Sequence, residues 1–280
     1  MSFLIKFPVY PFHLWLPEAH VEASTIGSVL LASILLKLGG FGCFQFVLPA
    51  TPFPTKYFLP LIEVLSCLGF FYCAIGALVQ LDFKKIIAYS SVVHMHLVIF
   101  AIFSFNHKAF LGSFLLMLSH GFTSAGIFFA LGSLYDRFGT RNILYLKGLV
   151  YTMPLFTSIF FLLILSNIGF PGTLNFISEI LSLAGILLIS KSCNLIFLFL
   201  GLLINTFYNF YFYSRLAFGN FTVALNNSSQ LFSFNLDLNK NEFFVLCSLV
   251  LINVFLGFFP GLLTQTTFIW YSFLTLKLTC

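Results

Sequence analysis

Apolar segments long enough to cross a membrane follow one another along almost the whole chain. A helix needs about 20 apolar residues to cross the ~30 Å hydrocarbon core of a bilayer, where only helices and closed barrels satisfy their own backbone groups. Charged residues make up 8% of the chain, against roughly 25% in soluble domains. The sequence therefore predicts an all-α, polytopic transmembrane helix bundle with about eight spans.

Two of these spans contain helix-breaking residues, so we expect both to be discontinuous. In the first span Lys6 is followed by Pro8 and Pro11, each of which removes a backbone donor. The apolar run at 149–189 is interrupted by NIGFPGT, residues 167–173, where a true loop would need polar residues to reach water. The expected spans cover residues 1–16 (incomplete), 24–48, 57–81, 86–105, 109–134, 149–189, 195–218 and 243–273.

Basic residues gather in loops that fall on one side of the predicted membrane. The turn near 82, the loop near 136 and the polar loop at 219–241 share this side if the run at 149–189 crosses the membrane once. By the positive-inside rule this side faces the matrix or the cytoplasm. It holds or adjoins Lys84, Lys85, Arg137, Arg141, Lys147, Arg215 and Lys240, whereas Lys56, Lys108, Lys191 and Lys277 lie opposite.

Four ionisable residues at predicted membrane depth are candidate relay sites for protons: Lys6, Lys37, His120 and Glu179. Lys6 and Glu179 each flank a helix break, an arrangement typical of ion sites in transporters built from inverted repeats. Desolvation disfavours the charged form of both side chains, so each can exchange a proton. His120 lies in LSHGFTSAG, whose small residues admit water or close helix packing. The pattern indicates movement of charge across the membrane.

The same residues allow simpler interpretations. Lys6 and Lys37 could extend their ammonium groups to the membrane surface instead of lying at its centre. His94 and His96, in SSVVHMH, are interpreted as core histidines. The two lysines of DFKK are interpreted as ordinary loop charges.

Several kinds of ligand are not indicated. The six cysteines form no CxxC pair, no facing histidine pair suggests haem, and no nucleotide-binding glycine loop occurs. The formal charge of +5 is spread over loops, which argues against nucleic acid. We therefore expect no cofactor, no metal and no electron transfer in this chain.

Four motifs in combination are familiar: HLWLPEAHVEASTIGSVLLASILLKLGGFG, DFKKIIAYSSVVHM, LSHG and GFPGTLNFISE. They closely resemble the antiporter-like, proton-pumping subunits of respiratory complex I, the NADH:ubiquinone oxidoreductase. The resemblance implies a fold of fourteen helices with two inverted five-helix repeats, of which this chain matches helices seven to fourteen. It implies proton-relay roles for Lys6, Lys37, His120 and Glu179. It also places FMN, iron–sulfur clusters and ubiquinone in partner subunits.

The resemblance further implies a division of the chain and a location. Residues 1–48 would be the remainder of the first repeat, 49–218 the second five-helix repeat, 219–241 an exposed loop and 242–280 a C-terminal helix. The expected location is the mitochondrial inner membrane, in contact with lipid, with a bacterial plasma membrane as the alternative. The 41 phenylalanines fit an AT-rich organelle genome.

The chain departs from the family pattern at three points. Ser24 stands where proline is usual, and His96 where glycine is usual. Helices one to six are missing, so we expect a separate chain to supply them and this chain to be the C-terminal piece of a split subunit, working with other membrane-arm subunits. Two alternatives stay open, a subunit of a multi-chain cation/proton antiporter and a structural remnant that no longer conducts protons.

Overall fold

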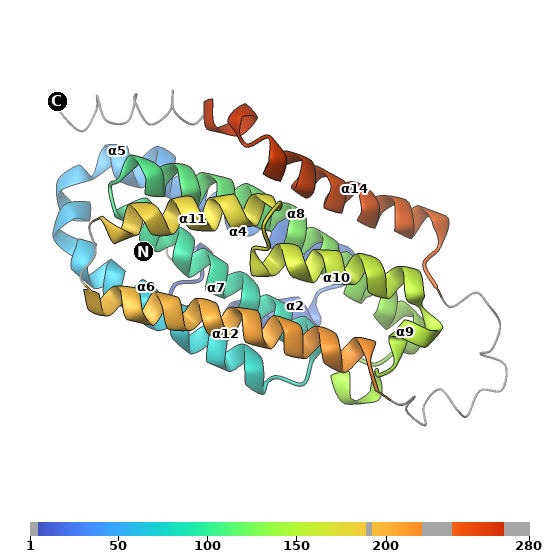
Figure 1. Ribbon diagram of the computed structural model, residues 1–280. Helices are drawn as coiled ribbons and strands as arrows, with labels where there is room; N and C mark the ends of the chain where they lie inside the picture. The colour runs from blue at the N-terminus through green and yellow to red at the C-terminus, as the bar shows by residue number, and fades with distance from the viewer. Residues whose placement is uncertain (1–4, 189–191, 220–236, 266–280) are drawn as a thin grey trace.

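The computed structural model describes residues 5–188, 192–219 and 237–265, almost all of them helical. Within these ranges six helices are long and apolar enough to span a membrane (Figure 1). The predicted all-α, multi-pass membrane bundle is confirmed. The elements are α2 (Trp15–Glu22), α3 (Thr25–Leu30), η1 (Leu31–Leu35), α4 (Leu36–Gly42), η2 (Cys43–Val47), α5 (Leu48–Ala50), α6 (Pro52–Val79), α7 (Phe83–Phe103), α8 (His107–Phe138), η3 (Ile143–Tyr145), α9 (Leu149–Thr152), α10 (Pro154–Ile168), α11 (Leu174–Leu187), α12 (Ser192–Ala217) and α14 (Lys240–Phe258).

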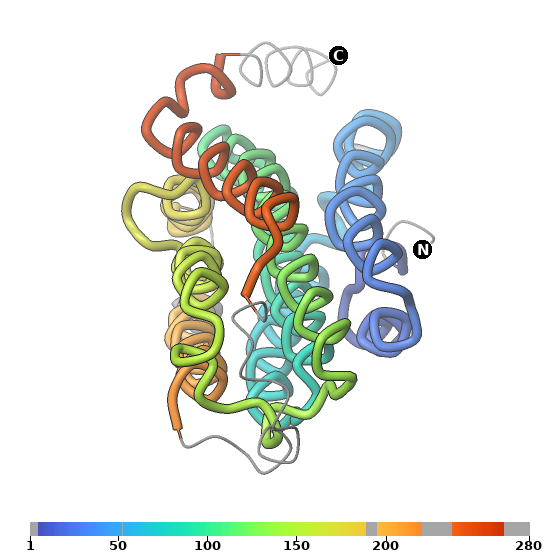
Figure 2. Tube along the Cα trace, turned by 90° about the vertical axis from the view of Figure 1, so that its right-hand side faces the viewer, coloured from blue at the N-terminus to red at the C-terminus, as the bar shows by residue number. Residues whose placement is uncertain are grey.

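The helices α7 and α8 form the centre of the bundle. In the most apolar stretch of α7 94% of the residues are buried, and in that of α8 72%. Figure 2 shows the N-terminal helices, in blue, on one side of this pair, and α10 to α12, in yellow-green to orange, on the other. Most polar side chains in the middle of α7 and α8 are therefore buried against other helices.

Glycines bring the backbones of α8 and α11 into contact. A Cβ atom added at Gly112 would lie 2.3 Å from the amide nitrogen of Ser182, and one added at Gly185 would lie 2.3 Å from that of Ala109. Small residues are the usual means by which membrane helices approach closely. The half-helix α11 is thereby held against the centre of the bundle.

The predicted span at 24–48 is a continuous helix over Thr25–Ala50 that contains two π-helical stretches, η1 and η2. The side-chain oxygen of Ser24 caps its start by accepting a hydrogen bond from the N–H of Gly27 at 3.3 Å. The helix continues past the predicted end because Pro49 is accommodated in the last turn, directly after η2. π-helical stretches interrupt the regular bonding of a helix and are frequent at functional sites.

The run at 149–189 contains the predicted break, between α10 and α11. Gly169 adopts φ +79°, a conformation that residues with side chains rarely adopt. Its N–H donates to the carbonyl of Ser166 at 3.2 Å, and the N–H of Phe170 donates to that of Leu165 at 3.0 Å. These are the two bonds of a Schellman motif. The discontinuous helix is therefore confirmed, with a defined turn at its centre.

Two of the loops predicted to share one side of the membrane, the turn near 82 and the loop after α8, lie together. The N–H of Phe83 donates to the carbonyl of Arg141, and that of Ile143 donates to the carbonyl of Leu81, both at 3.1 Å. These bonds join the turn before α7 to the loop after α8. The assignment of this side to the matrix or cytoplasm stays a prediction.

Charged groups at the same end tie three helices together. The guanidinium of Arg137, on α8, lies 2.5 Å from the carboxylate of Glu242 on α14 and donates to the carbonyl of Asp237 at 3.2 Å. The carboxylate of Asp237 accepts from the N–H groups of Leu155 (2.9 Å) and Phe156 (3.0 Å) at the start of α10. These backbone donors have no partner within their own helix, so Asp237 satisfies both.

The last predicted span, 243–273, needs correction. The helix α14 ends at Phe258. The next residue, Phe259, precedes Pro260, and proline makes the helical conformation unfavourable for the residue before it. Residues 261–265 are helical again. The remainder of this span and residues 220–236 of the predicted loop lie outside the described residues, and the division into domains stays a prediction.

The contact between α8 and α11 predicts a large effect of a single methyl group. Gly185→Ala places a Cβ atom 2.3 Å from the amide nitrogen of Ala109, so α11 must shift, at a cost of about 1–3 kcal/mol for overpacking. We expect the assembled protein to dissociate at a lower temperature on native gels. Gly261→Ala, where the added carbon has no atom of the described residues within 4 Å, should melt like the wild type. Equal melting of both variants would contradict the close packing.

Candidate functional site

Lys37 lies on α4, directly after η1, and is half-buried. Its ammonium group donates a hydrogen bond to the carbonyl of Ala32. A Cβ atom added at Gly121 of α8 would lie 3.8 Å from Cε of Lys37. Gly121 follows His120 and has no side chain, so the side chain of Lys37 lies directly against the backbone of α8 at this point.

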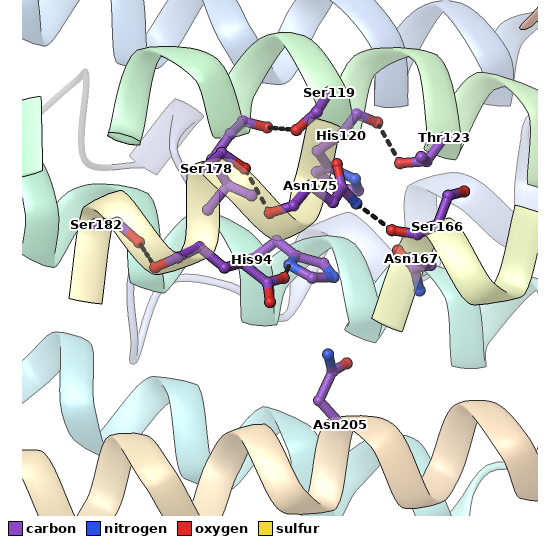
Figure 3. A network of polar contacts seen from close by, with 12 residues as sticks. His94, Ser119, His120, Thr123, Ser166, Asn167, Asn175, Ser178, Ser182 and Asn205 are labelled. Carbon is purple, nitrogen blue, oxygen red and sulfur yellow. Dashed lines mark hydrogen bonds and ion pairs between the residues drawn. The ribbon is translucent and has the colours of Figure 1, made fainter. Parts of the chain in front are cut away.

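Two buried histidines lie together between α7 and α8 (Figure 3). The ring centres of His94 and His120 are 5.1 Å apart, with the ring planes tilted by 43°. Neither ring nitrogen of His120 has a hydrogen-bond partner among the described residues. Buried polar atoms are normally bonded, so an unpaired imidazole indicates a place for water or for a functional role. His120 also interacts electrostatically with Lys37.

Glu179, on α11, lies on the other side of His94. Its Oε1 atom is 3.6 Å from Nδ1 of His94, a gap that a small rotation of the side chain can close. The side chain is buried and points back to the break, since a Cβ atom added at Gly169 would lie 2.6 Å from Oε2. Glycine at this position therefore serves the left-handed turn and also leaves room for the carboxylate.

Asparagines line the break beside Glu179 (Figure 3). The amide of Asn175 donates to the carbonyl of Ser166 at 2.7 Å, which joins α11 to the end of α10. The amide of Asn167 donates to Oδ1 of Asn209, on α12, at 3.0 Å. The side-chain oxygens, Oδ1, of Asn167 and Asn175 are buried and have no hydrogen-bond partner among the described residues. Such groups are the usual ligands of buried water.

Lys37, His120, His94 and Glu179 thus follow one another across α4, α8, α7 and α11. Three of them were predicted as relay residues. His94 was interpreted as a core histidine; it is buried, and its ring lies between two of the predicted residues. On a helix His94 and His96 point about 200° apart, so only one of them could face α8. The sequence does not say which.

Comparison with known proteins places this arrangement in a family. The model of the family described as "NADH:quinone oxidoreductase/Mrp antiporter, TM" matches residues 1–205. The chain belongs to this family. Chain 4 of NADH-ubiquinone oxidoreductase from Chondrus crispus is 44% identical over 260 residues, which are 93% of this chain and 51% of the relative. The resemblance drawn from the four motifs is confirmed.

A bacterial relative and two solved structures are also similar to this chain. NADH-quinone oxidoreductase subunit M of Rhodobacter capsulatus is 39% identical over 264 residues, 94% of this chain and 50% of the relative. A chain of respiratory complex I from Thermus thermophilus superposes with a TM-score of 0.87 at 28% identity, over 99% of this chain and 57% of that one. A chain of the Mrp complex from Dietzia sp. shares the fold, with a TM-score of 0.85 at 15% identity, over 99% of this chain and 60% of that one. The chain spans about half the length of the curated relatives it matches.

Lys6, the remaining predicted relay residue, stands apart in this member of the antiporter family. Its side chain is exposed on the surface of the described chain. The next residue, Phe7, is buried against α4, since a Cβ atom added at Gly39 would lie 3.1 Å from Cδ2 of Phe7. The role of Lys6 stays a prediction.

Lys84, interpreted as an ordinary loop charge, is buried. Its ammonium donates to the carbonyl of Ala23 at 3.1 Å, and Arg141 donates to that of Val21 at 2.7 Å. Both carbonyls lie at the C-terminal end of α2, where a helix has unpaired acceptors and the negative end of its dipole. The ring of Tyr135 lies 5.9 Å from Nζ of Lys84 and 4.6 Å from Cζ of Arg141. The interpretation is corrected, because the partner of Lys84 is 61 residues away in the sequence.

His20 is a further buried histidine, which the sequence did not single out. Its ring stacks on Phe128 of α8, with ring centres 4.4 Å apart and planes within 5°. Neither ring nitrogen has a hydrogen-bond partner in the described part of the chain. His20 therefore packs directly against the central helix α8.

The bond from Lys84 to α2 predicts a local effect. Lys84→Met keeps the length of the side chain but removes the charged hydrogen bond, which contributes about 1.5–3 kcal/mol. We expect the backbone amides of residues 15–24 to exchange hydrogen faster, measured by mass spectrometry. Lys85→Met, at the half-exposed neighbour, is the matched control and should leave this exchange unchanged. Unchanged exchange in Lys84→Met as well would show that α2 does not depend on the bond.

Proposed function

We propose that this chain is a proton-translocating membrane-arm subunit of an NADH:ubiquinone oxidoreductase, related to chain 4. The observation that carries the proposal is the line of Lys37, His120, His94 and Glu179, of which the last three are buried. All four side chains can hold or release a proton. Ionisable groups inside an apolar bundle are costly to bury and are by default an indication of a functional site. The relatives named NADH-ubiquinone oxidoreductase chain 4 support the assignment.

In this mechanism a proton passes along the line in short steps. Lys37 takes it up near the matrix or cytoplasmic half of the bundle. His120 and His94 relay it, since an imidazole accepts a proton on one nitrogen and releases one from the other. Glu179 receives it across the 3.6 Å gap and passes it toward the opposite side beside the break. Water at Asn167 and Asn175 is expected to complete the exit.

Two further residues are proposed for proton entry. Lys6 keeps its predicted role at the first break, on a face that the first repeat would cover. His20, stacked on Phe128 of α8 with both ring nitrogens unpaired among the described residues, would bring protons toward the line. Both roles concern uptake, and neither alters the order of the line.

The energy for this movement comes from partner subunits. We propose that FMN, iron–sulfur clusters and ubiquinone lie in those subunits and that this chain carries no redox chemistry. Moving one charge against 100 mV requires ~2.3 kcal/mol. Quinone reduction elsewhere would supply it by shifting charge along the polar centre of the membrane arm.

The first repeat completes the pump. Mass spectrometry of the NADH-oxidising native-gel band would show whether a separate chain supplies helices one to six, as the resemblance implies. A second short hydrophobic chain in that band would support the split subunit, whereas peptides continuous with this sequence at its N-terminal side would exclude it.

Neutralising Glu179 tests the relay. Glu179→Gln keeps the size of the side chain but removes its exchangeable proton, so protons moved per NADH should fall by the share of this subunit. The measurement is proton uptake by vesicles that contain the assembled complex, with NADH oxidation as the check on assembly. Asp136→Asn, at an exposed residue, is the matched control. Full proton transfer in Glu179→Gln would favour the non-conducting remnant, and sodium-dependent transport without NADH oxidation would favour the cation/proton antiporter.

A second test separates the position of the carboxylate from its charge. Gly169→Ala and Gly172→Ala both place alanine at a positive φ, +79° and +97°, so both carry a similar backbone strain. Only Gly169→Ala puts a methyl group 2.6 Å from the carboxylate of Glu179, whereas at Gly172 the nearest atom, on Phe258, is 3.7 Å away. We expect proton transfer per NADH to fall more in Gly169→Ala. An equal fall in both would assign the effect to the backbone.

A further inference from the structure

The second histidine of α7, His96, contacts the first break of the chain. Its side chain is fully buried. Nε2 accepts a hydrogen bond from the backbone N–H of Tyr10 at 3.0 Å, and Nδ1 donates to the carbonyl of Val92 at 2.8 Å. Because both nitrogens are bonded in fixed directions, the ring is held in one neutral tautomer. His96 is therefore the core histidine that the sequence predicted, with a partner 86 residues away.

Tyr10 lies in FPVYP, between the two prolines that interrupt the first helix. Other bonds of this break are local. The N–H of Phe12 donates to the carbonyl of Val9 at 2.6 Å, and the indole of Trp15 donates to the carbonyl of Ile5 at 3.1 Å. The bond to His96 differs because it joins the break to the central helix α7. Without this bond the N–H of Tyr10 would be an unpaired donor in an apolar environment, which costs several kcal/mol of folding free energy.

The neighbouring helix α6 leaves space for this ring. A Cβ atom added at Gly69 would lie 2.0 Å from Nε2 of His96, the same atom that accepts the bond from Tyr10. The Tyr10 ring then packs on His13 and on Tyr72 of α6, with ring centres 5.6 Å and 5.5 Å away. The break therefore packs against both α6 and α7, and its polar contact with α7 is the imidazole of His96.

We propose that His96 is a positioning residue that fixes the first break, and with it the backbone that carries Lys6, against α6 and α7. The inference rests on the proposed function only where it concerns proton transfer. The imidazole does not itself carry the proton, because both of its nitrogens are committed to backbone groups.

A matched pair of variants in the assembled complex tests the contact. The side-chain oxygen of His96→Gln reaches about as far as Nε2 and can accept the bond, whereas His96→Leu has similar size and no acceptor. Hydrogen exchange of residues 7–14, measured by mass spectrometry, should be near wild type in His96→Gln and about five- to thirty-fold faster in His96→Leu. Gly69→Ala, which displaces the ring without changing it, should resemble His96→Leu. Equal exchange in the Gln and Leu variants would overturn the proposal.

Proton transfer per NADH gives the functional readout. His96→Leu should lower it and His96→Gln should restore it, with NADH oxidation unchanged in both. Faster exchange with an unchanged proton yield in His96→Leu would overturn the positioning role. The exchange measurement needs no pumping, so failure of the proposed function, seen as full transfer in Glu179→Gln, is distinguishable from failure of this inference.

Discussion

Inside a bilayer every backbone N–H and C=O must find its partner within the protein, and the rest of this structure depends on how interrupted helices meet that condition. At the second break a Schellman motif closes α10, and Asn175 bonds across to it. At the first break His96 accepts the N–H of Tyr10. At the end of α2 the cations of Lys84 and Arg141 bond to the last carbonyls. Each solution brings polar side chains deep into the bundle, where ionisable groups can then be buried beside them.

Each of three polar side chains lies against a glycine on another element, which gives it room without opening the bundle to lipid. Gly121 of α8 lies beside Lys37, Gly169 at the end of α10 beside Glu179, and Gly69 of α6 beside His96. Gly112 and Gly185 act on the backbone itself and hold α11 against α8. The short gaps between His120, His94 and Glu179 depend on this close packing, because a carrier separated by an extra layer of side chains could not pass a proton.

Much of the architecture could be predicted because it follows from local rules. Span lengths follow from the thickness of the bilayer, and the break before Glu179 follows from glycine and proline in an apolar run. The neighbourhood of the turn before α7 and the loop after α8, seen in the bonds that join them, agrees with the count of spans. The end of α14 was missed although Pro260 marks it, since the apolar composition continues past that residue.

The sequence by itself determined that the chain is a membrane bundle, which residues interrupt its helices and which family it joins, since hydropathy, proline and glycine act through the nearest neighbours in the chain. Only the tertiary structure decided what the two histidines of α7 do. They are two residues apart, yet one faces His120 and Glu179 and the other faces Tyr10. Likewise Lys84 looked like a loop charge until α2, distant in sequence, supplied its carbonyl partner. The reason is that the direction of a side chain follows from the helix, whereas what it meets there depends on which other helix packs against that face.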